Sequence, residues 1–248
     1  MKKDVKAGTI GKGIGCAVLL FISLFPIYWL IAMAIRPTSE MEGSISLFPR
    51  SLTFEYFVDL FQNEGFGQAI LNSAQTTFGS LVISLLVGIC AAYVIARKRF
   101  QFGMKQPMTY WVLLIRVLPP VAFVIPLYIM FNQIGLINTK IPVLLACVLI
   151  NVPLIIWFLL SFFQDLPDEV EESAKVDGAT EWQLFYKIVL PLVAPGIAAV
   201  AMLSFMYAWN EYTYTVIFTR SSMNNTVPLA LALLNTEDSL TNFGLVAA

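Results

Sequence analysis

The chain has 248 residues, of which 58% are hydrophobic and only 12% are charged, and its mean hydropathy is +0.77. A soluble domain is about half apolar and about a quarter charged, so this surplus of apolar surface requires a bilayer as its solvent. The net charge of −1 argues against nucleic acid as a partner. The chain has no histidine, the commonest general base and metal ligand, so we expect no catalytic site, metal or cofactor of its own.

A transmembrane helix requires about 20 mostly apolar residues. Five stretches meet this requirement: 14–35, 71–96, 107–131, 141–163 and 191–212. The first is too long for a signal peptide and is interpreted as a retained span. The last residues turn apolar again from Phe243, which predicts the beginning of a sixth span that the chain truncates. We therefore predict an all-α membrane protein, a polytopic helical bundle of five transmembrane helices with a truncated sixth.

Basic residues indicate how these spans are oriented, because loops on the inner side of a membrane are enriched in Lys and Arg. With a cytoplasmic N-terminus, ten basic residues lie inside (Lys2, Lys3, Lys6, Lys12, Arg97, Lys98, Arg99, Lys105, Lys175, Lys187) and four outside (Arg36, Arg50, Lys140, Arg220). We predict a multi-pass protein of the inner or plasma membrane. Residues 1–13 form a cytoplasmic segment and 14–248 a single transmembrane domain with an outer loop, 36–70, and a cytoplasmic loop, 164–190.

The cytoplasmic loop is acidic and carries clear helix signals. Asp165 is predicted to be an N-cap, and the acidic residues after it favour the positive end of a helix dipole. Gly178 is placed to end this helix in a left-handed conformation. Thr180 and Gln183 form a capping box that begins a second short helix, which ends where the fifth span begins. The sequence therefore predicts a rigid helix–turn–helix. A rigid loop can transmit force to the spans that it joins, whereas a flexible loop cannot.

The loop resembles the EAA motif of binding-protein-dependent ABC importers, which reads EAA, three residues, G, nine residues, I-x-L-P. Here Glu172-Ser173-Ala174 is followed by Gly178 and by the run 188–191, IVLP, with every spacing kept and only Ser173 departing from the pattern. The neighbouring Asp177, Ala179 and Phe185 resemble the carbohydrate branch, the maltose-transporter-like permeases. Shorter pieces that match this branch in the right order are Arg36-Pro37, Asn72-Ser73, Pro119-Pro120, Pro126-Leu127, Gly135-Leu136, Asn138-Thr139 and Trp209-Asn210.

The resemblance implies that the loop is a coupling helix that docks on a separate ATPase subunit. The residues to which it assigns this coupling are Val170, Glu172, Ser173, Ala174, Asp177, Gly178, Ala179, Phe185, Leu190 and Pro191. It implies a permease subunit that forms half of the pathway for a disaccharide or oligosaccharide. The implied partners are a second permease subunit, two copies of the ATPase subunit and an extracytoplasmic solute-binding protein.

No ATP-binding loop is evident in the sequence. The nearest match to a P-loop runs from Gly8 to Gly13, but no Ser or Thr follows Lys12 and no strand precedes it. We therefore expect ATP to be bound by the partner subunit and this chain to be non-catalytic.

Six residues are candidates for the substrate pathway. Arg116 lies near the middle of the third span, where a charge is costly and marks function by default. It lines the pathway, or it bonds backbone carbonyls freed by Pro119 and Pro120, and both interpretations stay open. Asn151 is a candidate helix–helix contact as well. The others, each with packing or interfacial anchoring as its alternative, are Tyr128, Trp209, Asn210 and Glu211.

Two alternatives to a sugar permease remain. An ABC permease for another solute, such as glycerol phosphate, would keep the EAA core, and Arg116 would suit an anionic substrate. A secondary transporter would usually show internal repeats and an acidic residue in the middle of a span, and neither is evident in the sequence.

Overall fold

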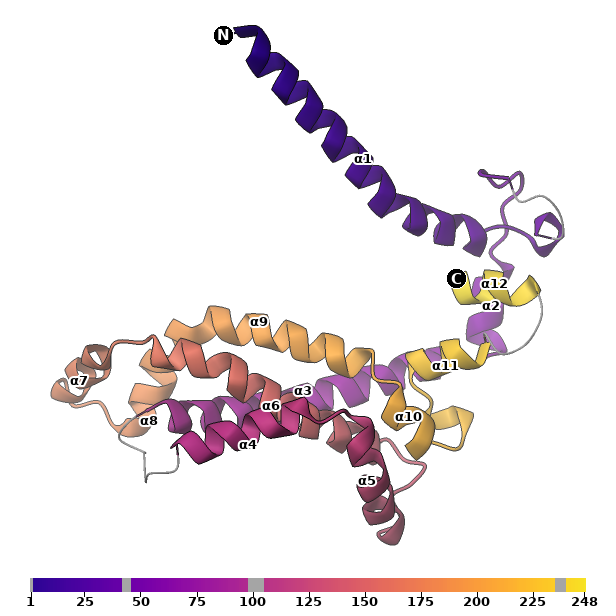
Figure 1. Cartoon of the computed structure of the whole chain (residues 1–248). Coiled ribbons are helices and arrows are strands. Elements are labelled where there is room, and N and C mark those ends of the chain that lie inside the picture. The colour runs from indigo at the N-terminus through magenta and orange to yellow at the C-terminus, as the bar shows by residue number, and fades with distance from the viewer. Residues whose placement is uncertain (1, 42–45, 98–104, 235–239) are drawn as a thin grey trace. The chain divides into compact units, whose positions relative to one another are not determined.

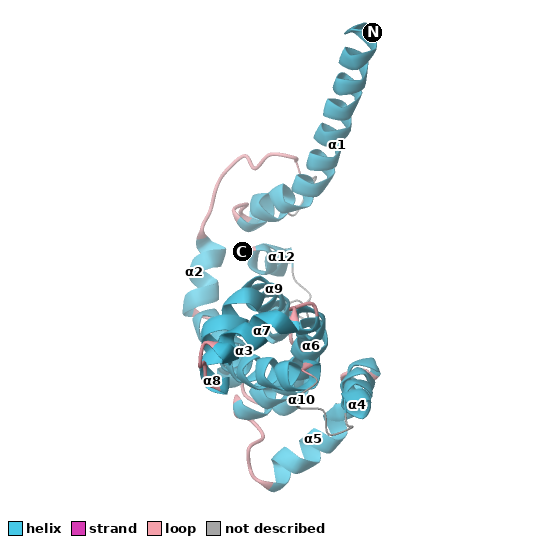
Figure 2. Cartoon of the chain, turned by 90° about the vertical axis from the view of Figure 1, so that its left-hand side faces the viewer, coloured by secondary structure: helices cyan, strands magenta, loops and turns pink. Residues whose placement is uncertain are grey.

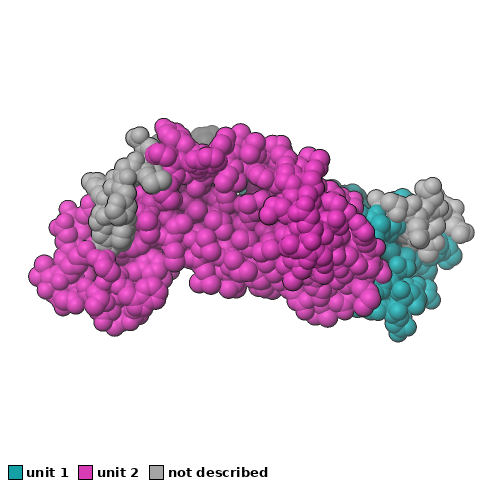
Figure 3. All heavy atoms as spheres, turned by 90° about the horizontal axis from the view of Figure 1, so that it is seen from below, with its two compact units in different colours: residues 1–67, 230–248 teal, residues 68–229 magenta. Residues whose placement is uncertain are grey.

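The computed structural model describes residues 2–41, 46–97, 105–234 and 240–248, and every regular element within these ranges is helical (Figure 2). The predicted all-α fold is confirmed. The chain divides into two compact units, residues 1–67 with 230–248 and residues 68–229 (Figure 3). The single domain over 14–248 stays a prediction, and Lys98 and Arg99 lie outside the described residues.

The first unit joins both ends of the chain. It contains α1 (Lys2–Ala34), the short 3-10 helix η1 (Thr38–Glu40), α2 (Glu55–Gln62) and α12 (Leu240–Ala247) (Figure 1). Tyr56 of α2 is buried against Gly244 of α12, and its hydroxyl lies 2.8 Å from the Thr38 hydroxyl. The predicted outer loop thus folds on the C-terminal residues, and the sixth span stays a prediction.

The remaining helices belong to the second unit, except that α3 and α11 each cross its boundary, α3 after residue 67 and α11 after residue 229. They are α3 (Phe66–Ala96), α4 (Lys105–Val117), α5 (Val121–Gln133), α6 (Ile141–Gln164), α7 (Asp168–Val176), α8 (Glu181–Gln183), the π-helix η3 (Leu184–Val189), α9 (Leu190–Trp209), α10 (Thr213–Phe218), the 3-10 helix η4 (Ser222–Asn224) and α11 (Val227–Leu234). A Cβ atom on Gly88 of α3 would lie 2.6 Å from the Ile155 side chain of α6, so these helices pack as closely as membrane helices do at small residues.

Four helices are long and apolar enough to cross a membrane: Lys12–Ala34, Phe66–Ala96, Ile141–Gln164 and Glu181–Trp209. The predicted third span is not one straight helix. Its halves, Pro107–Val117 and Val121–Gln133, meet at 95°, and the number of spans is five if this bent pair is counted as one span. The bend follows from Pro119 and Pro120, which lack the N–H groups that would continue the helix.

The predicted fifth span begins about ten residues earlier than expected, at Glu181 and not at Pro191. The second short helix of the loop does not end before Pro191, because residues Glu181–Trp209 form one continuous helix. A proline inside a helix normally breaks it. Here the preceding turn is the π-helix η3, in which the Leu190 N–H bonds the Phe185 carbonyl five residues back. This wider turn lets the Pro191 ring fit without a break, and it joins the loop rigidly to α9.

Candidate functional site

The loop between α6 and α9 begins with α7. The predicted N-cap, Asp165, is wrong: it is the C-cap residue of α6, and Pro167 occupies the N-cap position of α7. Leu166 and Pro167 form the link, since a residue before proline is driven out of the helical conformation. Three acidic residues lie in the first turn of α7, where they complement the helix dipole: Asp168, Glu169 and Glu171.

The turn after α7 has the predicted conformation. Gly178 has φ +83, in the left-handed region that favours glycine, and the Ala179 N–H bonds the Ala174 carbonyl at 2.9 Å. The capping box is present as predicted: the Thr180 hydroxyl accepts from the Gln183 N–H, and the Gln183 side chain accepts from the Thr180 N–H. The helix–turn–helix is therefore defined by local hydrogen bonds.

One face of this helix–turn–helix is buried against the bundle. Ala174 and Phe185 are both buried, and the Phe185 ring lies 4.9 Å, between centroids, from the ring of Tyr93 on α3. Tyr93 contacts Phe163 of α6 in turn, at 5.6 Å. The loop thus packs on the ends of α3 and α6 as well as continuing into α9. Of the other predicted coupling residues, Val170, Ala179 and Leu190 are half-buried and Pro191 is exposed.

The opposite face is exposed and acidic. Glu172 and Asp177 are exposed, and Ser173 directs its hydroxyl back to the Glu169 carbonyl at 2.7 Å. Two apolar side chains are also strongly exposed beside them, Val176 at 87% and Trp182 at 70%. An exposed surface that mixes carboxylates with a large aromatic side chain is suited to contact with another protein.

Sequence reasoning missed Arg97, which follows the last residue of α3. Its guanidinium is buried and forms ion pairs with Glu171, between Nε and Oε1 at 2.7 Å, and with Asp168, at 3.2 Å. It also donates to the Leu166 carbonyl at 3.1 Å. An arginine at the end of a span is a sequence signal for orientation and does not by itself indicate a buried ion pair.

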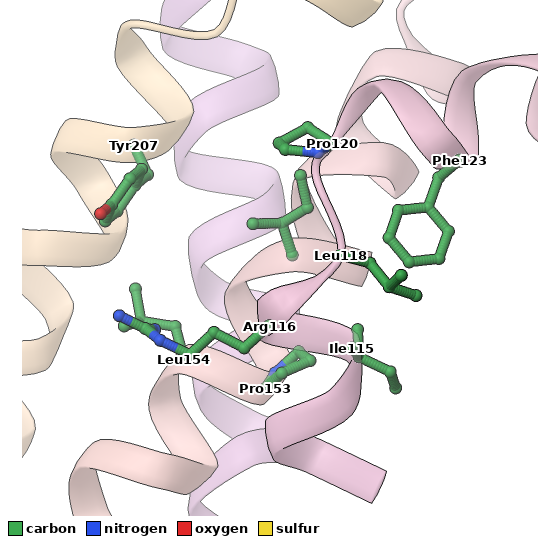
Figure 4. Close-up of a pocket in the computed structure, with 9 residues that line it drawn as sticks. Ile115, Arg116, Leu118, Pro120, Phe123, Pro153, Leu154 and Tyr207 are labelled. Atoms are coloured by element: carbon green, nitrogen blue, oxygen red, sulfur yellow. The ribbon is translucent and has the colours of Figure 1, made fainter.

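A second candidate region lies around the bend between α4 and α5. Arg116 lines a cavity of about 190 Å³ together with Pro120, Pro153 and Tyr207 (Figure 4). The guanidinium lies 4.8 Å from the centre of the Trp157 ring, a cation–π contact, and the arginine stays exposed. In Figure 4 its side chain extends from α4 toward the side on which Tyr207 of α9 lies. Arg116 is thus exposed at the wall of this cavity in the single chain.

An adjoining cavity of about 200 Å³ shares Pro120, Ile150 and Tyr207 with the first. Three predicted pathway residues line it: Asn151, Asn210 and Glu211. Asn151 is buried and donates to the Ser204 carbonyl of α9 at 3.3 Å, as a helix–helix contact would, while its Oδ1 has no hydrogen-bond partner among the described residues. The structure therefore brings four of the six candidates to two neighbouring cavities.

Glu211 has a structural role at this cavity. Its carboxylate accepts from the Tyr214 N–H at 2.7 Å and from the Thr215 N–H and hydroxyl, both at 3.1 Å. These bonds cap the first turn of α10. Asn210, the C-cap residue of α9, donates to the Met206 carbonyl at 2.8 Å.

The remaining two candidates do not line either cavity. The Tyr128 hydroxyl accepts from Arg220 at 2.6 Å, and its ring stacks on Phe218. Trp209 stacks on Phe205 with centroids 5.6 Å apart. Tyr207, which sequence reasoning missed, lines both cavities; nothing in the apolar run 190–209 distinguished it.

Membrane-length helices, two largely apolar cavities lined by a few polar side chains, and a rigid acidic loop are the features expected of a membrane permease. Residues 84–248, more than half of the chain, match the family described as the binding-protein-dependent transport system inner membrane component. The chain belongs to this family. The resemblance drawn from the EAA spacing is confirmed, and so is an inner-membrane location.

The chain is also similar to curated permeases. It is 33% identical over 210 residues to the trehalose transport system permease protein SugB of Mycobacterium tuberculosis, covering 85% of this chain and 76% of that one. It is 32% identical over 222 residues to the diacetylchitobiose uptake system permease protein DasC of Streptomyces coelicolor, with 89% and 80% covered. The arabinooligosaccharides transport system permease protein AraQ of Halalkalibacterium halodurans is 32% identical over 232 residues, with 90% and 80% covered.

Among solved structures, the fold resembles a chain of a bacterial ABC transporter involved in the import of the acidic polysaccharide alginate. The TM-score is 0.81 at 19% identity, over 98% of this chain and 90% of that chain. At this identity the likeness shows the fold alone.

Proposed function

We propose that this chain is the permease subunit of an ABC importer for a disaccharide or oligosaccharide and forms half of its transmembrane pathway. The observation that carries the proposal is the loop 164–190, which presents an exposed acidic face while its buried face is fixed to α3, α6 and α9. The loop lies in the cytoplasm and docks on a separate ATPase. The chain itself is non-catalytic, and ATP binds to the partner.

The remaining partners follow from the family. A solute-binding protein delivers the sugar on the outer side, and a second permease subunit completes the pathway with two ATPase copies. ATP binding favours one of two arrangements of the spans, so that the solute site opens to one side at a time. The trehalose, diacetylchitobiose and arabinooligosaccharide permeases among its relatives support a saccharide substrate.

A second substrate class is favoured by one observation. Arg116 is a cation in a largely apolar cavity, which suits a solute with a carboxylate, sulfonate or phosphate. An anionic glycoside or a glycerol phosphate is therefore the alternative substrate. A secondary transporter is disfavoured because the described centres of the spans hold no carboxylate.

The test is reconstitution of the assembled complex in liposomes, with the solute-binding protein supplied on the side that corresponds to the cell exterior. ATP-dependent uptake of neutral disaccharides is compared with uptake of anionic glycosides at equal concentration. Uptake without ATP, or a complex that contains no ATPase subunit, would contradict the importer.

Arg116→Ala tests the pathway assignment. We expect uptake to fall several-fold while the amount of inserted protein stays near that of the wild type. The guanidinium is exposed, and its cation–π contact with Trp157 contributes only about 0.5–2 kcal/mol. Arg116→Lys, which keeps the charge, is the matched control. Parallel loss of uptake and of inserted protein would instead indicate a structural arginine.

A further inference from the structure

Arg97 connects α3 to a part of the chain that is about 70 residues away in sequence. Its Nη1 bonds the Leu166 carbonyl in the link before α7 and the Asp168 carboxylate, and its Nε pairs with Glu171. Asp168 and Glu171 are one turn apart on α7 and so lie on the same face. One guanidinium thus fixes both the beginning and the direction of α7.

The pair Arg97–Glu171 is buried, with the two residues only 5% and 6% exposed. A buried charge is tolerated when it is paired, and arginine suits this place because its planar fork can hold two acceptors at once. The Asp168 side chain is 60% exposed, so its contact contributes less. Glu171 is therefore the principal partner of Arg97 among these contacts.

The two adjacent glutamates of α7 face different ways. Neighbouring residues on a helix point about 100° apart, and here Glu171 is buried against Arg97 while Glu172 is exposed. A movement imposed on the exposed side of α7 therefore acts on Arg97 through a close, buried ion pair. The contact between Phe185 and Tyr93 is apolar and does not define the tilt of α7 in this way.

We propose that Arg97 is a positioning residue that makes α3 move with α7, so that the coupling loop drives this span as well as the two to which it is covalently joined. The inference rests on the proposed coupling function of the loop. Without the ion pair, α7 remains connected to α6 and α9 by the backbone, and its contact with α3 is reduced to apolar packing that follows a rotation of α7 less closely.

The test uses Arg97→Met, Glu171→Met and the double variant, each in the complete reconstituted complex. Each single variant leaves a buried charge without this partner, so we expect at least about a fivefold loss of assembled complex. The double variant removes both charges and should restore assembly to within about twofold of the wild type. Its uptake, however, should stay below about a tenth of the wild-type value. Asp168→Asn, at the exposed contact, should have the smallest effect on both quantities.

A distance measurement gives a readout that a purely structural role would not change. Spin labels replace Val94 on α3, which is 43% exposed, and Lys175 on α7, whose side chain is 40% exposed, after Cys16, Cys90 and Cys147 are changed to serine. In the otherwise wild-type complex the distance between the labels should be the same with and without ATP. In the double variant it should change when ATP is added.

Recovery of uptake together with assembly in the double variant would overturn the proposal, because Arg97 would then only stabilise the fold. Single variants with wild-type uptake would overturn it as well. Glu172→Lys in the same complex distinguishes a failure of the Arg97 proposal from a failure of the proposed docking of the loop on the ATPase. If Glu172→Lys stops uptake while the double variant transports normally, only the role of Arg97 is lost. If Glu172→Lys transports normally, the docking function itself is contradicted.

Discussion

Reversing the charge of Glu172 should stop ATP-driven uptake while leaving the protein inserted and folded. Glu172 is exposed on α7, so Glu172→Lys disturbs no buried contact of this chain. At a docking surface the same change replaces a complementary charge with a repelling one, and truncation of a buried interface charge alone costs about 2–5 kcal/mol. We therefore expect uptake to fall at least about tenfold. The measurements are sugar uptake in proteoliposomes and the ATPase subunit retained on purification.

The controls separate docking from general effects of charge. Glu64→Lys makes the same charge reversal at an exposed residue of the other unit and should leave uptake near wild type. Glu172→Gln keeps the shape of the side chain without its charge, so its uptake should lie between that of the wild type and that of Glu172→Lys. Wild-type uptake by Glu172→Lys would contradict the coupling role of the loop.

Replacing Gly178 with valine should uncouple transport by a different route. The residue has φ +83, and a β-branched side chain is strained there by roughly 1–2 kcal/mol. No neighbouring atom lies within 4 Å of an added Cβ, so the effect comes from the backbone and not from a clash. Relief of the strain rotates α7 relative to α8. We expect binding-protein-stimulated ATPase activity and uptake to fall together by about tenfold.

Gly135→Val is a closely matched control. Gly135 has φ +71, its Cβ position is equally open, and it lies in the same unit after α5. Both variants should lose similar thermal stability, but only Gly178→Val should lose the ATPase stimulation. Equal losses of stimulation in both would mean that backbone strain anywhere in the unit impairs the complex, and the specific role of the Gly178 turn would be rejected.

The sequence was most informative where local chemistry decides the structure. The left-handed Gly178 and the capping box of Thr180 and Gln183 depend on residues within one turn of each other, and both are present as predicted. Spans were found because about 20 apolar residues admit few other structures. The EAA spacing identified the family because the residues of this motif are held at fixed positions by short-range helix and turn geometry.

Features that depend on distant residues were not predictable. The burial of Arg97 depends on Glu171, 74 residues later, and an arginine at the end of a span is normally interpreted as an orientation signal. Glu211 was considered for sugar binding, but it caps α10, a helix of only 6 residues that no periodicity reveals. The 95° angle at Pro119–Pro120 was missed because prolines within spans often produce only a kink.

The bend at Pro119–Pro120 has a consequence for hydration. Two successive prolines provide no N–H for the carbonyls of Ile115 and Arg116, four residues earlier, and hydrocarbon offers such groups no replacement donor. The Tyr214 hydroxyl donates to the Pro120 carbonyl at 2.9 Å, which satisfies one polar group at this place. Irregular backbone at membrane depth is tolerated where it faces protein or an aqueous space. Both cavities include Pro120 in their walls, so the bend borders open space, and we expect water there to bond the carbonyls that the prolines leave without a donor.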